Sequence, residues 1–141
     1  MKNYFKTSSK TIYMEDFLNK KNKIAVIGVS NNHEKWGYRV YKTLKSSGFS
    51  VYAVNPKHTK IDSDRCYPDL RSIPEKLDEV ITIVPPKVTE SIVKVCKELN
   101  IKKVWMQPGS ESEDAIRFCK ENGIDVMYNA CFVVDGLEET I

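Results

Sequence analysis

The sequence of 141 residues contains few of the groups that carry acid–base or metal chemistry. It has two histidines, and neither His33 nor His58 has a carboxylate or a cysteine at a spacing suggestive of catalysis. The four cysteines lie far apart, without a C-x-x-C pair or a histidine cluster nearby, which argues against a zinc site. We therefore expect neither a bound metal nor a catalytic residue.

Long apolar runs and an excess of one charge are also missing. No stretch has the ~18 consecutive apolar residues of a membrane span, and the first 22 residues lack the apolar core of a signal peptide. We expect a cytoplasmic protein with no membrane partner. The 22 basic and 19 acidic residues are scattered, with a net charge of +3, so the sequence shows no footprint for nucleic acid.

The residues that are present favour one folded domain. Hydrophobic residues make up 41% of the chain and charged residues 29%, which is ordinary for a globular protein. A chain of this length suits a single core, because two cores would each bury too little apolar surface. No internal repeat or low-complexity segment is present.

Short β-branched runs alternate with segments of helical periodicity along the chain. The predicted strands are 24–29, 51–54, 79–84, 103–106 and 124–128. Helical spacing relates Trp36, Val40 and Leu44 after the first strand, and similar faces follow the third and fourth strands. This alternation, at roughly 25-residue spacing, predicts right-handed βαβ crossovers. The expected fold is a single-domain, doubly wound, Rossmann-like α/β fold with a five-stranded parallel sheet.

Capping residues and turn residues give the expected element boundaries. Gly48 and Gly123 are placed to end helices, and Ser110 with Glu113 has capping-box spacing for a helix start. Residues 57–77 are predicted to form a loop, with turns or one short helix. Residues 1–22 form an N-terminal extension whose stretch 14–21 is either a short helix packed on an edge or part of a frayed terminus. The domain itself spans 23–141.

The loops at the carboxyl ends of the predicted strands are where a doubly wound sheet binds its ligands. Gly28, after the first strand, allows a sharp turn close to an anion, and the next helix offers free N–H groups. The second and third glycines of the G-x-G-x-x-G fingerprint are missing, so a plain βα turn is an equally good interpretation.

The second strand ends without the acidic residue that receives the ribose hydroxyls of NAD. Lys57 stands there instead, and a lysine could hold the 3′-phosphate of coenzyme A or the 2′-phosphate of NADP. A solvated surface lysine is the alternative. Pro85-Pro86 could pack on an adenine or simply end a strand, and Cys131 could face the pocket or be a buried structural cysteine.

Several motifs together resemble a known family. They are IAVIGVS, VNPK, CYPDL, VWMQPGS and the late cysteine, and they extend from about Lys23 to Cys131. This pattern is similar to the small CoA-binding domain proteins, and to the N-terminal CoA-binding domain of the succinyl-CoA synthetase α subunit. The family's apolar or acidic-aromatic stretch around the third strand is ITIVPP here, a mild departure.

The resemblance implies that the strand-end loops hold coenzyme A. Gly28 and Ser30 would contact the pyrophosphate with Tyr38 and Arg39 near it, and residues 55–57 would contact the adenosine end. Residues 84–86 would contact the adenine or the pantetheine, and residues 107 and 109 would line the far side. The full implied set is Gly28, Val29, Ser30, Tyr38, Arg39, Asn55, Pro56, Lys57, Val84, Pro85, Pro86, Gln107, Gly109 and Cys131.

The leading hypothesis is a non-catalytic protein that binds coenzyme A or an acyl-CoA and acts as a sensor, carrier or accessory module. No acid–base pair or phosphohistidine segment is recognised in the sequence. The alternatives are an NADP-linked oxidoreductase and a nucleotide-binding interaction module. The sequence does not indicate a particular protein partner.

Overall fold

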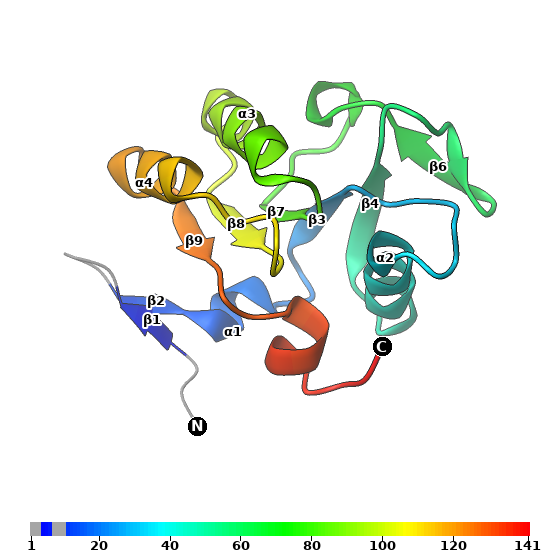
Figure 1. Ribbon diagram of the computed structural model, residues 1–141, viewed down its shortest axis with the longest axis horizontal. Helices are drawn as coiled ribbons and strands as arrows, with labels where there is room; N and C mark the ends of the chain where they lie inside the picture. Colours follow the sequence, from blue (N-terminus) through cyan, green and yellow to red (C-terminus); the bar gives the residue numbers. More distant parts are fainter. Residues whose placement is uncertain (1–3, 7–10) are drawn as a thin grey trace.

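A seven-stranded sheet forms the middle layer of the computed structural model, which describes residues 4–6 and 11–141 (Figure 1). Its strand order is β5-β6-β4-β3-β7-β8-β9, and every neighbouring pair is parallel except the antiparallel pair β5 and β6. The strands are β3 (Lys23–Ile27), β4 (Ser50–Val54), β5 (Lys60–Ile61), β6 (Asp64–Tyr67), β7 (Glu79–Thr82), β8 (Lys103–Met106) and β9 (Asp125–Met127). The strand order reverses between β3 and β7, which is where such sheets bind ligands.

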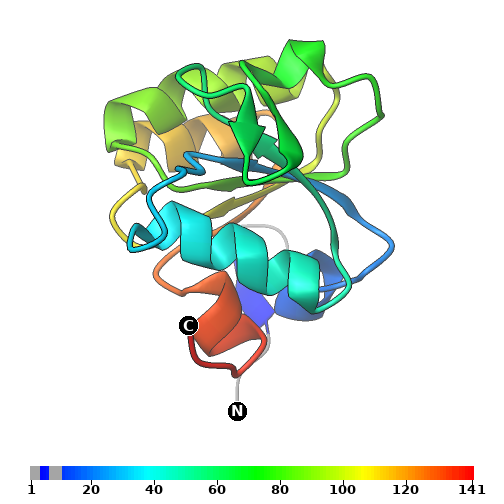
Figure 2. The ribbon, with the colours of Figure 1, turned by 90° about the vertical axis from the view of Figure 1, so that its right-hand side faces the viewer.

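Helices cover both faces of this sheet (Figure 2). One face carries α1 (Met14–Phe17), α2 (Trp36–Ser46) and the π-helix η2 (Phe132–Gly136). The other carries the 3₁₀-helix η1 (Leu70–Ser72), α3 (Pro86–Glu98) and α4 (Glu113–Glu121). The sequence of β3 is almost continuously apolar because both faces of the strand are buried. Ile24 and Val26 belong to the core cluster on one face, and Ala25 and Ile27 belong to the cluster on the other. A separate antiparallel pair is formed by β1 (Tyr4–Lys6) and β2 (Thr11–Tyr13).

The predicted Rossmann-like α/β fold with a mostly parallel sheet is confirmed, but the predicted number of five strands is wrong. Strands β5 and β6 lie within 57–77, which the sequence analysis assigned to a loop. They are two and four residues long, and only Ile61 and Cys66 are buried in them. Such strands show no apolar alternation in the sequence. They join the sheet because β6 pairs with the neighbouring β4 and β5 pairs with β6.

The helix ends agree with the sequence at the carboxyl ends and differ at one amino end. Gly48 and Gly123 follow α2 and α4 with φ values of +93° and +71°, as expected of glycines after a helix. The cap of α4 is Ser112, whose Oγ accepts from the amide of Ala115 at 3.2 Å. Ser110, the predicted cap, is instead buried and hydrogen-bonded to the loop after β8.

The segments at the two ends of the sequence pack on the same face of the sheet. The predicted short N-terminal helix covers only Met14–Phe17, and its Phe17 ring meets the Trp105 ring edge-on at 5.7 Å, so it packs on a face of the sheet. Beyond β9, Phe132 of η2 lies 4.9 Å from the same Trp105 ring, centroid to centroid, in a segment for which the sequence predicted no helix or strand. No helix of the described residues is long and apolar enough to span a membrane.

Candidate functional site

Three adjoining cavities lie at the carboxyl ends of the central strands. The central cavity, of about 610 Å³, lies among the ends of β3, β4 and β7 and the first turns of α2 and α3. It shares Ile27 and Val54 with the α3 cavity, of about 300 Å³, and Trp36 and Pro85 with the Trp36 cavity, of about 410 Å³. The three therefore form one cleft at the switch point of the sheet, and the central volume suits a small-molecule ligand.

Gly28 makes the turn at the end of β3. Its φ is +103°, and its amide donates to the Val54 carbonyl at 3.0 Å. A Cβ atom at this position would lie 2.1 Å from the backbone oxygen of Ile83, so no larger residue fits without moving β7 or its loop. The glycine is required by the packing of two adjacent strand ends, whether or not a ligand is present.

Gly37, in the first turn of α2, was not singled out in the sequence. A Cβ atom there would lie 2.2 Å from the Gly28 carbonyl oxygen, so this glycine lets α2 pack directly on the turn. Close helix–strand packing is the role of the third glycine in a dinucleotide fingerprint. This role of Gly37 is not apparent from the sequence, because Gly37 follows Gly28 by a longer loop than the fingerprint allows.

The first turn of α2 faces the central cavity through Trp36 and Gly37. Its N-cap residue is Lys35, which makes no side-chain capping bond, and no acidic residue lies in this turn. The first amides of an α-helix have no partner within the helix and carry its positive partial charge. This end of α2 is therefore suited to an anion.

The loop after β4 forms the opposite wall of the central cavity. Asn55 connects the two strand ends, since its Nδ2 donates to the Val29 carbonyl at 2.8 Å while its Oδ1 accepts from the Lys57 amide at 2.9 Å. Both ends of this side-chain amide are thus used to hold the loop. Lys57 is exposed and lines the cavity.

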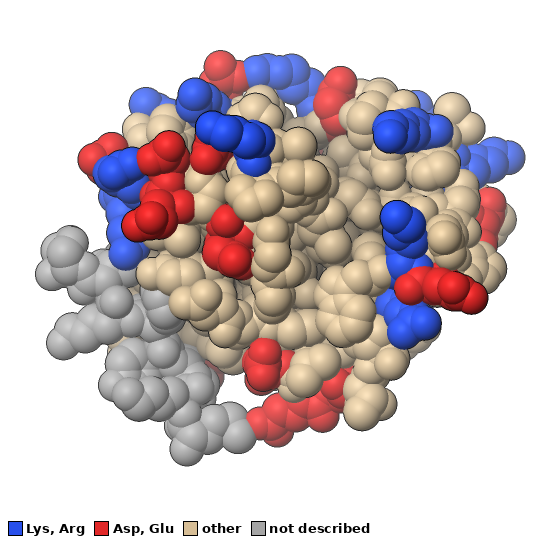
Figure 3. All heavy atoms as spheres, viewed as in Figure 1, with Lys and Arg blue, Asp and Glu red and all other residues tan. Residues whose placement is uncertain are grey.

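The charges at the central cavity are cationic. Lys35 and Lys57 line it, whereas none of the described residues that line it is acidic. Over the face shown in Figure 3, basic and acidic side chains are interspersed around the periphery, and the middle carries mainly uncharged residues. The cationic lining is therefore a local property of the central cavity.

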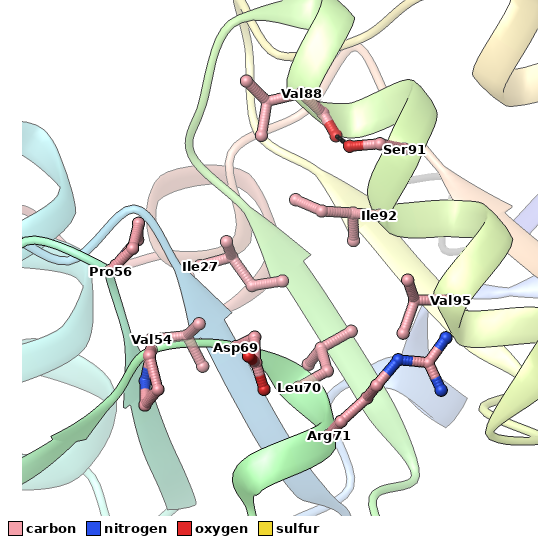
Figure 4. A pocket seen from close by; sticks show the side chains of 11 residues that line it. Ile27, Val54, Pro56, Asp69, Leu70, Arg71, Val88, Ser91, Ile92 and Val95 are labelled. Carbon is pink, nitrogen blue, oxygen red and sulfur yellow. Dashed lines mark hydrogen bonds between the residues drawn. The ribbon is translucent and has the colours of Figure 1, made fainter.

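The α3 cavity is a mainly apolar slot beside the central cavity. Val88, Ile92 and Val95 of α3 lie across from Leu70 of η1, and the ends of β3 and β4 form the floor (Figure 4). Arg71 lies at its rim, with its guanidinium paired to Glu98. Such a slot fits a flat apolar surface with a polar edge.

The hairpin of β5 and β6 holds the loop that leads into α2. Asp62, in its turn, accepts from the Tyr38 hydroxyl at 2.7 Å and pairs with Lys42 Nζ at 3.0 Å and His33 Nε2 at 3.2 Å. These bonds, the one from Tyr38 foremost, lower the pKa of the Asp62 carboxyl to about 2. The Asn31 side chain adds a bond to the Lys60 carbonyl at 2.7 Å. One wall of the cleft is thereby fastened to the sheet edge.

Many of the residues that the sequence suggested are brought together by this cleft. Those lining the central cavity are Gly28, Ser30, Asn55, Pro56, Lys57, Val84 and Pro85. Gly109 lines the Trp36 cavity. Lys35, Gly37 and Val88 also line the central cavity and were not predicted from the sequence, and helical spacing had placed Trp36 on one face with Val40 and Leu44. That assignment is wrong, because Trp36 is 41% exposed at the cleft while Val40 and Leu44 are buried.

The other suggested residues lie away from the cavity linings. Val29 belongs to the core, and Tyr38 is bonded to Asp62. Arg39 is exposed further along α2, and Pro86 is exposed at the start of α3. Tyr38 and Arg39 were expected to lie together near the pyrophosphate, but residues one position apart on a helix point in different directions.

Gln107 and Cys131 are interior partners of one another. Gln107 is fully buried, with its Nε2 3.3 Å from Cys131 Sγ and its Oε1 accepting from the Phe132 amide at 2.7 Å. Cys131 is 5% exposed and caps η2. Of the two alternatives for Cys131, the structure shows the buried structural cysteine, which lines none of the three cavities. The pair joins the loop after β8 to η2 inside the core.

Residues 22–136 match the family described as the CoA binding domain. The chain belongs to this family. The membership expected from the sequence motifs is thus confirmed. Among curated proteins, the chain is 34% identical over 93 residues to the ADP-forming acetate–CoA ligase II of Archaeoglobus fulgidus, an alignment that covers 64% of this chain and 14% of the ligase. The chain thus spans only about a seventh of that relative's length.

Solved structures of similar size share the fold of this CoA-binding domain. A conserved hypothetical protein from Pyrococcus furiosus matches with a TM-score of 0.76 and 39% identity, covering 80% of this chain and 97% of that one. A hypothetical protein from Pyrococcus horikoshii matches with a TM-score of 0.80 and 32% identity, covering 83% and 82% of the two chains.

Proposed function

We propose that the protein binds coenzyme A or an acyl-CoA in the cleft, without catalysing a reaction on it. The observation that carries the proposal is the central cavity, where the uncapped start of α2, Lys35 and Lys57 surround a volume of about 610 Å³ that is lined by no acidic residue of the described chain. Coenzyme A carries a pyrophosphate and a 3′-phosphate close together, and this arrangement supplies a helix end for one and a lysine for the other.

The walls on either side suit the uncharged parts of the same molecule. The pyrophosphate would lie over the turn at Gly28 and the first amides of α2, and the 3′-phosphate would lie by Lys57. The adenine would then enter the α3 cavity, whose lining from Val54, Leu70 and Ile92 is apolar. Membership of the CoA binding domain family supports this choice of ligand over other anions.

The binding role rather than an enzymatic one is favoured by the cleft's side chains. Among the described residues, the carboxylate that lines the cleft is that of Asp69, which lines only the α3 cavity and caps η1 through the Ser72 amide at 2.9 Å. His58 lines the central cavity, and its Nδ1 lies 3.4 Å from Asn31 Nδ2; no carboxylate of the described residues is paired with it. A general base needs such an orienting group and a substrate proton within reach.

Calorimetric titration with coenzyme A, acetyl-CoA, NADPH and NAD tests the proposal. We expect binding of the two CoA compounds and none of NAD, because β4 ends without a carboxylate for the ribose hydroxyls. Binding of NADPH with none of coenzyme A would make the chain an oxidoreductase domain instead. Binding of none of the four would contradict the proposal and favour an interaction module.

A further inference from the structure

Trp36 is the large aromatic side chain that the cleft leaves exposed. It occupies the first position of α2, is 41% exposed, and lines both the central cavity and the Trp36 cavity. The other tryptophan, Trp105, is fully buried, and its indole N–H donates to the Ala130 carbonyl at 2.8 Å. An exposed indole at the wall of a cavity gains free energy when a ligand covers it, so Trp36 points to an apolar occupant.

The Trp36 cavity differs from its two neighbours in charge. Its lining residues are Trp36, Ile83, Val84, Pro85, Pro108, Gly109 and Ser110, and none of them is ionisable. Lysines line the central cavity, and Asp69 and Arg71 line the α3 cavity. The hydroxyl of Ser110 is occupied within the protein, since it bonds to the Thr82 and Gln107 carbonyls at 3.0 and 2.8 Å. This end of the cleft is suited to a neutral, apolar group.

The direction of the ligand follows from this asymmetry. Coenzyme A is charged at its nucleotide end and neutral along the pantetheine arm to the thiol. With the phosphates at α2 and Lys57, the neutral arm extends along Val84 and Pro85, which line both the central and the Trp36 cavity. The arm is thereby led to Trp36 and Pro108.

From these observations we infer that the Trp36 cavity holds the acyl group of an acyl-CoA, so that the preferred ligand is an apolar acyl thioester rather than free coenzyme A. The inference rests on the proposed function and extends it to the substrate class. Burying one methylene contributes about 0.8 kcal/mol, so each carbon added to the acyl chain strengthens binding about fourfold until the cavity is filled.

The test is a titration series with coenzyme A, acetyl-CoA, butyryl-CoA and hexanoyl-CoA on the protein and two variants. We expect the dissociation constant of the natural protein to fall along the series. Trp36→Ala should flatten the dependence on chain length, and Trp36→Phe should restore much of it. Val88→Ala is the matched control, because Val88 is also 41% exposed and lines the other two cavities but not this one. It should keep the dependence.

Adenosine 3′,5′-bisphosphate, which lacks the pantetheine and acyl parts, determines the direction of the ligand. Its affinity, measured by competition, should be the same for the natural protein and Trp36→Ala. A loss as large as that for hexanoyl-CoA would place the adenine against Trp36 and overturn the inference. Equal affinity for all four CoA compounds in the natural protein would overturn it as well, with the proposed function intact. Failure of coenzyme A and its thioesters to bind would contradict the proposed function itself.

Discussion

Two glycines allow close backbone packing at the carboxyl end of β3: Gly28 in the turn after this strand, and Gly37 in the first turn of α2. Gly28 packs against the Ile83 carbonyl, and Gly37 packs against the Gly28 carbonyl. The proposed anion site therefore depends on backbone contacts that leave no room for a side chain at either position. A mutation at either glycine acts first on the fold and only then on a ligand.

Replacing Gly28 with Ala should destabilise the protein by about 3 kcal/mol, because strain at a positive φ adds to the clash with the Ile83 oxygen. The control is Gly123→Ala, because Gly123 also has a positive φ but an added Cβ atom there would meet nothing within 4 Å. That variant should lose only about 1–2 kcal/mol. Urea unfolding of both variants measures the difference. Equal losses would mean that the turn at Gly28 is not closely packed.

In the proposed binding mode, Lys57 pairs with the 3′-phosphate of coenzyme A. Lys57→Ala should weaken coenzyme A by about 1 kcal/mol, as expected for an exposed charge-assisted contact, and should hardly affect dephospho-CoA. The two ligands and two proteins form a double-mutant cycle that isolates this contact. Arg39→Ala is the charge-matched control, since Arg39 is exposed but does not line the cavities. An equal loss for both ligands would assign the phosphate to another residue.

Sequence patterns located the backbone turns of the site better than its side chains. Gly28, Asn55 and Lys57 follow strands that periodicity reveals, so they could be placed at the carboxyl ends without a structure. Trp36 could not, because the first residue of a helix can continue its apolar face or turn away from it. Gly37 was hidden because its role depends on a contact with Gly28 that no short spacing rule describes.

At the scale of elements, the hairpin β5–β6 fastens the loop before α2 through Asp62. Its carboxylate accepts a hydrogen bond from the Tyr38 hydroxyl and pairs with Lys42 and His33. These contacts join the hairpin to the loop and to α2. The sequence does not reveal this hairpin because each of its two strands has only one buried residue, whereas the five predicted strands have their own apolar signal. The hairpin that the sequence did not reveal thus directly affects the shape of the cleft, because it holds the loop before α2.

Asp62→Asn should change how stability responds to acid. Because the folded pKa is about 2 and the ordinary value is 3.8, the contribution of this carboxylate is fully present above pH 3.8 and is lost as the pH falls toward 2. Asparagine tolerates the positive φ of 55° at this position, so the variant tests the charge rather than the backbone. Thermal unfolding from pH 2 to 5 should show a shallower slope for the variant, and unchanged slopes would refute a role for the network.

At the scale of the whole molecule, the two ends of the sheet differ. The cleft lies at the carboxyl ends, while Glu79 is fully buried where β7 begins. Its Oε1 accepts from Asn22 Nδ2 at 3.0 Å, and its Oε2 has no hydrogen-bond partner among the described residues. Burial raises the pKa of this carboxyl well above its usual value, against the opposing effects of Asn22 and Lys103; Asp78 adds to the rise. A buried acid thus lies at the end of the sheet opposite the cleft.

Glu79→Gln should stabilise the protein at high pH. A raised folded pKa means that the wild-type contribution is fully present below about pH 4.5 and is lost as the pH rises through the folded pKa. The neutral amide does not titrate, so the difference in melting temperature between variant and wild type should grow from pH 4 to pH 9 in favour of the variant. Differential scanning calorimetry measures it. A difference that is independent of pH would show that Glu79 does not titrate differently on folding.

The most direct test of a coenzyme A site in the cleft is a titration followed by amide resonances of the ¹⁵N-labelled protein. We expect saturable shifts at the amides of Gly28, Trp36 and Gly37 and in the loop 55–58, with none at Glu79 or Lys103 at the opposite end of the sheet. Shifts confined to that opposite end, or no saturable shift at millimolar coenzyme A, would contradict a coenzyme A site in the cleft.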